Sequence, residues 1–131
     1  IAEHARESAP NECCGILLAA REDAGTVTAV LRADNAEEQA PTRRYLIDHR
    51  TQLTALDLEI EGQAETAGYY HSHPAGGADP SPMDVEQAVP DTVYLICGMA
   101  RATPEFAAWR LAGEELVAQP IGVAHGNADE T

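Results

Sequence analysis

The chain has 131 residues, enough for one hydrophobic core and too few for a second. It carries 22 acidic and 8 basic residues, all of the latter Arg, and its formal net charge is −14. Because this charge repels phosphate backbones and anionic headgroups, we expect neither nucleic acid nor a membrane surface among its partners.

Large apolar residues are scarce: Leu, Ile, Val and Phe together make up 24 of the 131 residues. With such a net charge, this fraction is typical of disordered chains. The apolar residues nevertheless occur in short runs separated by turn residues, which indicates a folded α/β chain. The acidic, Lys-free composition fits a high-salt cytoplasm, and GC-rich codon usage would remove Lys equally well.

The three cysteines, Cys13, Cys14 and Cys97, cannot all pair with one another. Neighbouring residues of an extended segment point to opposite faces, and the chain has no C-x-x-C motif. We therefore expect reduced thiols and a cytoplasmic protein.

In chain order, the first expected element is a helix over residues 1–9, which ends before Pro10. The apolar run 13–20 and the alternating run 26–31 predict two strands. A turn at Ala24–Gly25 would join these strands as a hairpin.

After a polar loop, residues 45–47 predict a short strand that leads into a helix over roughly 49–62. Leu53, Leu56 and Ile60 recur at helical spacing and predict the apolar face of this helix.

The run 66–71 predicts a strand that leads into a Pro- and Gly-rich loop over 74–82. Ser81 is a favourable N-cap and Pro82 a favourable first helical residue. A short helix is therefore expected from this point to about Val89.

Three further strands are predicted over 93–97, 106–111 and 115–121. We expect one domain over residues 1–121, followed by a polar, disordered tail over 122–131.

Three possible metal ligands occur around the end of the strand at 66–71. His71 and His73 are separated by one residue, so their side chains share a face of an extended backbone. Asp84 lies in the first turn of the helix that follows. Two His and one carboxylate leave one position for water, which is the pattern of a catalytic zinc site rather than of a closed structural one.

A simpler interpretation is that the H-x-H pair is incidental and that the Pro- and Gly-rich loop is only a connection. His4, His49 and His125 lack partners at ligand spacing and are expected at the surface. Asp79 is expected to be a loop carboxylate close enough to the site to touch a substrate.

The segment Tyr70–Asp84, YHSHPAGGADPSPMD, resembles the signature of the JAMM (MPN+) metalloproteases, in which a Glu precedes H-x-H-x(7)-S-x-x-D. His73, Ser81 and Asp84 have the spacing of that signature. The Glu is matched by Glu12 in PNECCG, which resembles the P-x-E-x-C-G segment of prokaryotic members.

The resemblance implies a role for each matching residue. His71, His73 and Asp84 would hold one Zn²⁺, although Fe²⁺ or Mn²⁺ could occupy the same ligands. Glu12 would accept a proton from the zinc-bound water as general base and pass it to the leaving amine. Ser81 would donate a hydrogen bond to the oxyanion of the tetrahedral intermediate.

The resemblance covers roughly residues 1–121 and also implies the fold. The family has an α/β architecture with a curved, mixed, partly barrel-like sheet flanked by helices, a layout related to that of the cytidine deaminases. The deaminase motifs H-x-E and P-C-x-x-C are absent here, so base deamination is not expected.

Enzymes with this motif cleave amide bonds after the C-terminal Gly-Gly of ubiquitin or ubiquitin-like proteins. Small prokaryotic members resemble peptidases of sulfur-carrier proteins, and this chain lacks the insertions of members specific for polyubiquitin. We therefore expect a peptidase of a ubiquitin-like or sulfur-carrier protein. Two alternatives are a non-catalytic MPN scaffold, against which the intact motif argues, and a RadC-type protein, against which the net charge argues.

Overall fold

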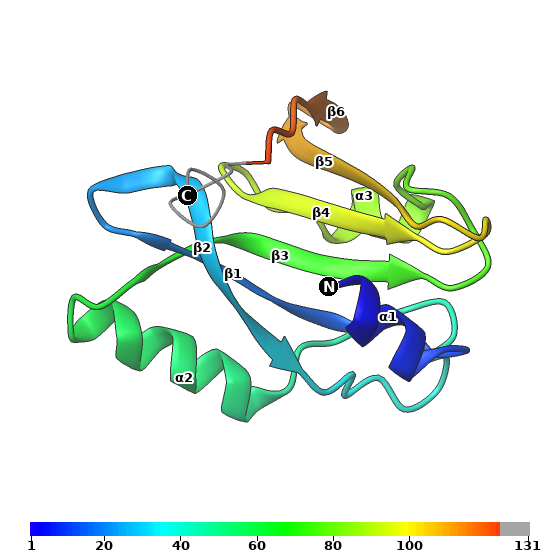
Figure 1. Cartoon of the computed structure of the whole chain (residues 1–131), viewed down its shortest axis with the longest axis horizontal. Helices are drawn as coiled ribbons and strands as arrows, with labels where there is room; N and C mark the ends of the chain where they lie inside the picture. Colours follow the sequence, from blue (N-terminus) through cyan, green and yellow to red (C-terminus); the bar gives the residue numbers. More distant parts are fainter. Residues whose placement is uncertain (124–131) are drawn as a thin grey trace, which may run out of the picture.

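A computed structural model of the chain describes residues 1–123, which form a six-stranded sheet with helices on both faces (Figure 1). In chain order the elements are α1 (Ala2–Ser8), β1 (Cys14–Ala20), β2 (Asp23–Ala33), α2 (His49–Ile60), β3 (Glu65–His73), α3 (Pro82–Gln87), β4 (Val93–Gly98), β5 (Glu105–Ala112) and β6 (Glu115–Gln119). This arrangement confirms the expected α/β class and mixed sheet. No helix within residues 1–123 is long and apolar enough to cross a membrane.

The strand order in the sheet is β2-β1-β3-β4-β5-β6. Only β3 and β4 run parallel, and the chain passes from one to the other through the loop after β3 and through α3. All other neighbouring strands are antiparallel. The parallel pair thus lies in the middle of the sheet, and the crossover starts where β3 ends.

The apolar core is divided between the two faces of the sheet because successive residues of each strand point to opposite sides. On one face, Ile16 and Leu18 pack with Ala55 of α2, and Tyr69 packs against this cluster. We call this the α2 face.

On the other face, Leu17 and Tyr70 pack with Ala5 of α1 and with Cys97. We call this the α1 face. Figure 1 shows α1 in front of the sheet and α3 behind it.

The prediction that Leu53, Leu56 and Ile60 form the buried apolar face of the second helix is wrong. Leu53, Leu56 and Ile60 are 46%, 50% and 73% exposed. The helix instead packs against the sheet through Ala55 and Leu58, three residues apart, so the predicted stripe is rotated away from the core.

The predicted hairpin forms, but its turn lies elsewhere. β1 and β2 are joined at Arg21–Glu22, and Ala24–Gly25 belong to β2. Shifts in the strand register near the end of β1 accommodate the longer second strand.

The short strand predicted at 45–47 is also absent, because this segment makes only one isolated bridge, between Ile47 and Asn35. The Asn35 side chain binds the backbone here, with its Oδ1 accepting a hydrogen bond from the Leu46 N–H at 3.0 Å.

His4, expected at the surface, is buried on the α1 face, where its Nδ1 lies 2.8 Å from the Tyr70 hydroxyl. The helix α1 packs over the ring of Tyr70 and brings His4 inside. His49 is exposed as expected. His125 and most of the predicted tail lie outside the described residues.

Candidate metal centre and active site

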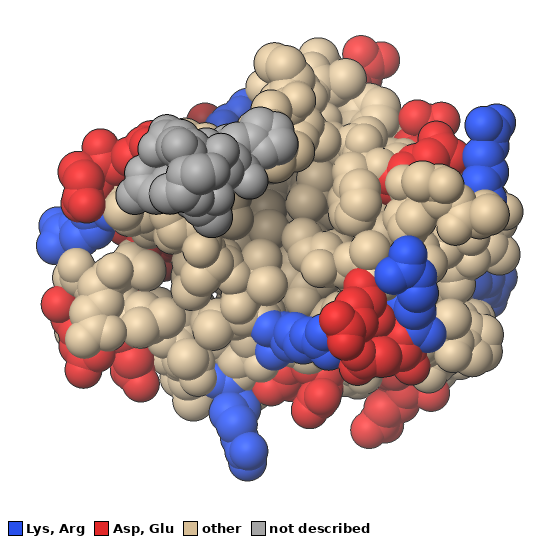
Figure 2. Space-filling view, in the orientation of Figure 1, with Lys and Arg blue, Asp and Glu red and all other residues tan. Residues whose placement is uncertain are grey.

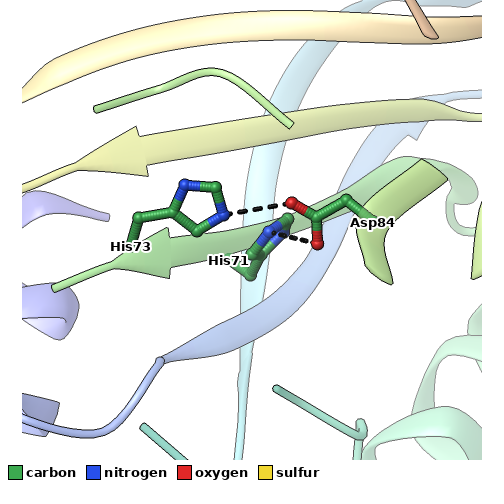
Figure 3. A group of neighbouring side chains, drawn as sticks. All are labelled: His71, His73 and Asp84. Atoms are coloured by element: carbon green, nitrogen blue, oxygen red, sulfur yellow. Dashed lines mark hydrogen bonds and ion pairs between the residues drawn. The ribbon is translucent and has the colours of Figure 1, made fainter. Parts of the chain in front are cut away.

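His71, His73 and Asp84 converge on one point of the α2 face (Figure 3). The two histidines come from the end of β3, and the aspartate comes from the first turn of α3. Asp84 Oδ1 lies 3.1 Å from His71 Nε2, and Asp84 Oδ2 lies 3.0 Å from His73 Nε2. The structure therefore brings together all three predicted ligands, which are separated by a loop in the sequence.

The environment of His71 fits a metal ligand. Its side chain is 1% exposed, and within residues 1–123 neither of its ring nitrogens has a hydrogen-bond partner. His71 Nε2 is therefore close to Asp84 without the alignment of a donor and an acceptor. Ligand atoms about 2.0–2.2 Å from a tetrahedral zinc lie roughly 3.3–3.6 Å apart. The two histidine–aspartate distances are slightly shorter, and the ligand atoms of all three residues lie within 4.8 Å of one another. The three residues could thus hold a zinc ion.

The loop after β3 fixes the orientation of the His73 ring. His73 Nδ1 lies 2.9 Å from the Gly77 carbonyl oxygen, which can only accept, so Nδ1 carries the proton and donates. His73 Nε2 is consequently the atom directed at Asp84. A backbone carbonyl on the far nitrogen of a histidine is a usual support for a metal ligand.

The same loop is held against the end of β4 and the neighbouring β5. Trp109 Nε1 donates a hydrogen bond to the Ala78 carbonyl oxygen at 2.9 Å. Gly98 lies so close to the loop that an added Cβ would be 2.4 Å from the carbonyl carbon of Gly77. The carbonyl that orients His73 is therefore placed by close packing with the sheet.

Ser81 caps α3 and orients Asp84. The Asp84 N–H donates to Ser81 Oγ at 3.1 Å, and the Ser81 N–H donates to Asp84 Oδ2 at 2.8 Å. This reciprocal pair is a capping box, and it confirms Ser81 as the predicted N-cap. Because Ser81 Oγ accepts in the cap, its own proton stays available for another acceptor.

The charges in this cluster are set by burial and mutual contact. Although burial opposes its ionisation, the adjacent His71 and His73 rings hold the pKa of the Asp84 carboxyl well below its usual range. Burial likewise opposes the charged form of His73, but the hydrogen bonds to Asp84 and Gly77 raise its pKa. Asp84 is therefore an anion next to imidazole groups, as a metal site requires.

Glu12 lies beside the cluster, two residues before the start of the neighbouring strand β1. Cys14 pairs with His71, and Cys13 exchanges hydrogen bonds with Ser72, so the antiparallel register places Glu12 next to His73. Glu12 is 5% exposed, and burial raises the pKa of its carboxyl to about 7, against the nearby charge of His73. A carboxylate with this pKa can both accept and release a proton near neutral pH.

Tyr45 is part of the site, although the sequence did not point to it. Its ring stacks on His71 with centroids 4.5 Å apart and planes 21° from parallel. Tyr45 also lines a cleft of about 450 Å³ that reaches Asp84 and continues between Tyr69, Met83 and Tyr94. A short aromatic segment after a loop gave no sign of this contact, which spans 26 residues of sequence.

Comparison with known proteins places these features in a family. The family described as prokaryotic homologs of the JAB domain matches residues 1–112. The chain is 39% identical over 102 residues to a desampylase of Haloferax volcanii, and the match covers 74% of this chain and 72% of that protein. It is 31% identical over 124 residues to a CysO-cysteine peptidase of Mycobacterium tuberculosis, covering 92% of this chain and 82% of that protein.

A third relative, a probable TtuB-protein conjugate cleaving protease of Thermus thermophilus, is 38% identical over 96 residues, which are 72% of this chain and only 61% of that protein. A solution structure of a protein from Desulfitobacterium hafniense shares the fold with a TM-score of 0.75 and 33% identity, covering 89% of this chain and 81% of that one. A solution structure of a protein from Salinibacter ruber has a TM-score of 0.65 and 33% identity, covering 95% of this chain and 85% of that one. The chain belongs to the prokaryotic homologs of the JAB domain.

Proposed function

We propose that this chain is a zinc peptidase that hydrolyses the peptide or isopeptide bond after the C-terminal Gly-Gly of a ubiquitin-like or sulfur-carrier protein. One observation carries the proposal: a buried glutamate with a pKa near neutral stands beside a His-His-Asp cluster that fits zinc. A general base next to a Lewis acid is what hydrolysis of an amide needs.

Three residues of the chain, His71, His73 and Asp84, would hold the ion. Bound zinc would lower the pKa of water from about 15.7 to about 7 and polarise the carbonyl to be attacked. Glu12 takes the proton of the attacking water and later delivers it to the leaving amine. Ser81, whose hydroxyl proton is not used in the helix cap, donates a hydrogen bond to the developing oxyanion.

The substrate class is supported by the relatives and by the shape of the site. The relatives are named as a desampylase, a conjugate cleaving protease and a CysO-cysteine peptidase, all names of enzymes that act on small protein modifiers or carriers. The cleft of about 450 Å³ beside Asp84 offers an extended tail a route to the cluster. A terminal Gly-Gly suits this route because only glycine lets a backbone pass so close to other atoms.

The setting that we propose is cytoplasmic, with residues 1–121 as the catalytic domain. Cys13, Cys14 and Cys97 are buried and free, as expected for a protein of a reducing compartment.

The direct test is cleavage of a ubiquitin-like sulfur-carrier protein extended beyond its Gly-Gly by a short reporter peptide. The zinc-loaded wild-type chain should release the reporter at the bond after the second glycine, as mass spectrometry of the carrier would record. The matched control substrate ends in Ala-Ala instead of Gly-Gly and should be cleaved far more slowly. Intact carrier after prolonged incubation with loaded enzyme, for each Gly-Gly carrier tried, would leave the non-catalytic scaffold as the better account.

A further inference from the structure

Glu12 does not belong to a strand: β1 begins two residues later, at Cys14. The ladder between β1 and β3 therefore does not by itself hold the backbone of Glu12. The carboxylate is nevertheless buried beside His73, so other contacts must fix the backbone from which it extends.

The peptide unit between Glu12 and Cys13 is held from both sides by side chains. Its carbonyl oxygen accepts a hydrogen bond from Asn35 Nδ2 at 3.2 Å, and its N–H donates to Ser72 Oγ at 2.8 Å. On the other side of the Glu12 Cα, the Glu12 N–H donates to the Pro41 carbonyl oxygen at 2.8 Å. Every backbone polar group of Glu12 thus has a partner from elsewhere in the fold.

Ser72 is the central member of this set. It lies between His71 and His73 in β3, so its side chain points to the opposite face of the sheet and away from the metal cluster. The residue is fully buried. Its N–H also donates to the Cys13 carbonyl oxygen at 3.1 Å. Ser72 therefore hydrogen-bonds to the backbone of Cys13 through both its own N–H and its hydroxyl.

The hydroxyl does what no apolar side chain could do at this position. The Cys13 N–H lies among buried residues, and without Ser72 Oγ it would lose its acceptor. A buried donor without a partner is unfavourable, so the Glu12–Cys13 peptide would move to find another acceptor. The Glu12 carboxylate, one residue away, would move with it.

We propose that Ser72 is a positioning residue for Glu12: its hydroxyl fixes the Glu12–Cys13 peptide relative to the two histidines on either side of it in β3. One three-residue segment thereby sets the distance between the base and the metal ligands. The inference rests on the proposed function, because it takes Glu12 as the general base.

Ser72→Ala is the test, with Ser72→Thr as the variant that keeps a γ-hydroxyl. Cleavage of the Gly-Gly reporter substrate by Ser72→Ala should show a kcat lower by roughly 10- to 100-fold with an unchanged KM, because a small displacement of a catalytic group has effects of this size. Ser72→Thr should recover most of the lost kcat. Zinc affinity, measured by competition with a chelator, should equal that of the wild type in both variants.

A readout independent of activity is hydrogen exchange of the Cys13 amide. Exchange should be faster in Ser72→Ala than in the wild type and near the wild-type rate in Ser72→Thr. Cys97→Ala is the matched control, because Cys97 pairs with Ser72 in the sheet and is equally buried, but its thiol hydrogen-bonds to Met99 Sδ at 3.6 Å, whereas Ser72 binds the N–H of the Glu12–Cys13 peptide. It should lower the melting temperature while leaving kcat and Cys13 exchange unchanged.

A double variant separates positioning from general damage. Added to Glu12→Gln, Ser72→Ala should cause no further loss of the residual rate, because there is no base left to position. If Ser72→Ala does not fold, Ser72→Cys, which keeps the volume and offers only a weak acceptor, takes its place with the same expected losses.

Two results would overturn the inference. One is a wild-type kcat in Ser72→Ala or its Cys replacement; the other is a loss of zinc affinity in step with kcat, which would show that Ser72 acts through the histidines. These results differ from failure of the proposed function, in which the wild type itself does not cleave or Glu12→Gln still does.

Discussion

The pKa values of the two carboxylates of the site are shifted in opposite directions, although burial alone would raise both. Asp84 lies against two imidazole rings and a backbone N–H, and its pKa is held well below the usual range despite burial. Within residues 1–123 the Glu12 carboxylate has no hydrogen bond or ion pair of this kind, and burial raises its pKa to about 7. The same side-chain chemistry thus provides a permanent anion suited to a metal and a group suited to proton transfer.

Replacing Glu12 by Gln should abolish proton transfer without affecting metal binding. The variant keeps the volume of the side chain, so the metal cluster should bind zinc as the wild type does. Cleavage should fall by roughly 10²- to 10⁴-fold, the usual contribution of a positioned general base. Reporter cleavage and elemental analysis on the same preparation would check both. Glu38→Gln, at an exposed glutamate, is the matched control. Cleavage by Glu12→Gln within a few-fold of the wild-type rate would remove the assignment of the base.

The metal-free protein should lose stability as the pH rises from about 4.5 to 7. In this window the unfolded chain has released the Glu12 proton while the folded chain retains it, so folding binds a proton and weakens with rising pH. The raised pKa of His73 acts in the same direction near neutral pH. The part due to Glu12 amounts to at most about 3 kcal/mol.

Urea unfolding of the metal-free protein at several pH values in this range would measure how steeply the free energy of unfolding falls with pH. The fall should be less steep for Glu12→Gln than for the wild type. Equal slopes in the two proteins would mean that Glu12 titrates normally in the folded state.

At the level of elements, the site depends on how the loop after β3 packs against the end of β4. Gly98 allows the contact, and Gly77 supplies the carbonyl that orients His73. Strand, loop and helix must therefore all be in place before the three ligands converge.

Gly98→Ala should disturb the site although Gly98 is buried and is not one of the proposed catalytic or metal-binding residues. The new methyl group would meet the loop backbone at 2.4 Å, where nothing flexible can yield. We expect a loss of about 1–3 kcal/mol in stability, typical of overpacking, together with weaker zinc binding as Gly77 is displaced. Gly77→Ala is the control in the same contact, because an added Cβ there meets nothing within 4 Å. Denaturant unfolding and chelator competition would report the two effects, and the prediction is wrong if the two variants behave alike.

The sequence predicted the elements well where local chemistry decides them. Ser81 and Pro82 predicted the start of α3, and β-branched or apolar runs predicted the strands. Periodicity was misleading for α2, because the leucines that share a face do not face the sheet. Ser72 was outside the prediction as well, since its role depends on a contact with Cys13, 59 residues away.

The three candidate metal ligands were predicted from their spacing and from the family resemblance, and Glu12 from the resemblance alone; both signals are local patterns. The residues that support them were not predicted, because Asn35 and Tyr45 act through the packing of the loop between β2 and α2, to which the sequence gave no role in the site. The strand order, with a parallel pair in the middle, likewise followed from no local signal.

At the level of the whole molecule, the charge is the feature that most affects behaviour in solution. Figure 2 shows acidic side chains around the edge of the α1 face and, next to arginines, over α1 itself, with an uncharged area over the middle of the sheet. Four of the eight arginines lie within 4.0 Å of a carboxylate in the described residues. Most acidic groups therefore repel one another without a nearby cation.

Salt should stabilise the protein. Raising KCl from about 0.05 to 1 M shortens the screening length from roughly 14 Å to 3 Å and weakens this repulsion. The melting temperature of the metal-free chain should rise over this range, and sucrose at equal osmolality serves as a control for effects other than screening. A melting temperature that falls with KCl would show that the four ion pairs outweigh the repulsion.

The measurement that tests the central claim most directly is the metal content of the chain, purified without a chelator or a metal-affinity step. Elemental analysis should find about one zinc per wild-type chain and little in His73→Ala, because removing one of three ligands opens the site. Reconstitution with zinc should restore the wild type and not the variant. No metal in the wild type even after zinc is added back, or equal metal in both proteins, would contradict the assignment of His71, His73 and Asp84 as the ligands of a catalytic ion.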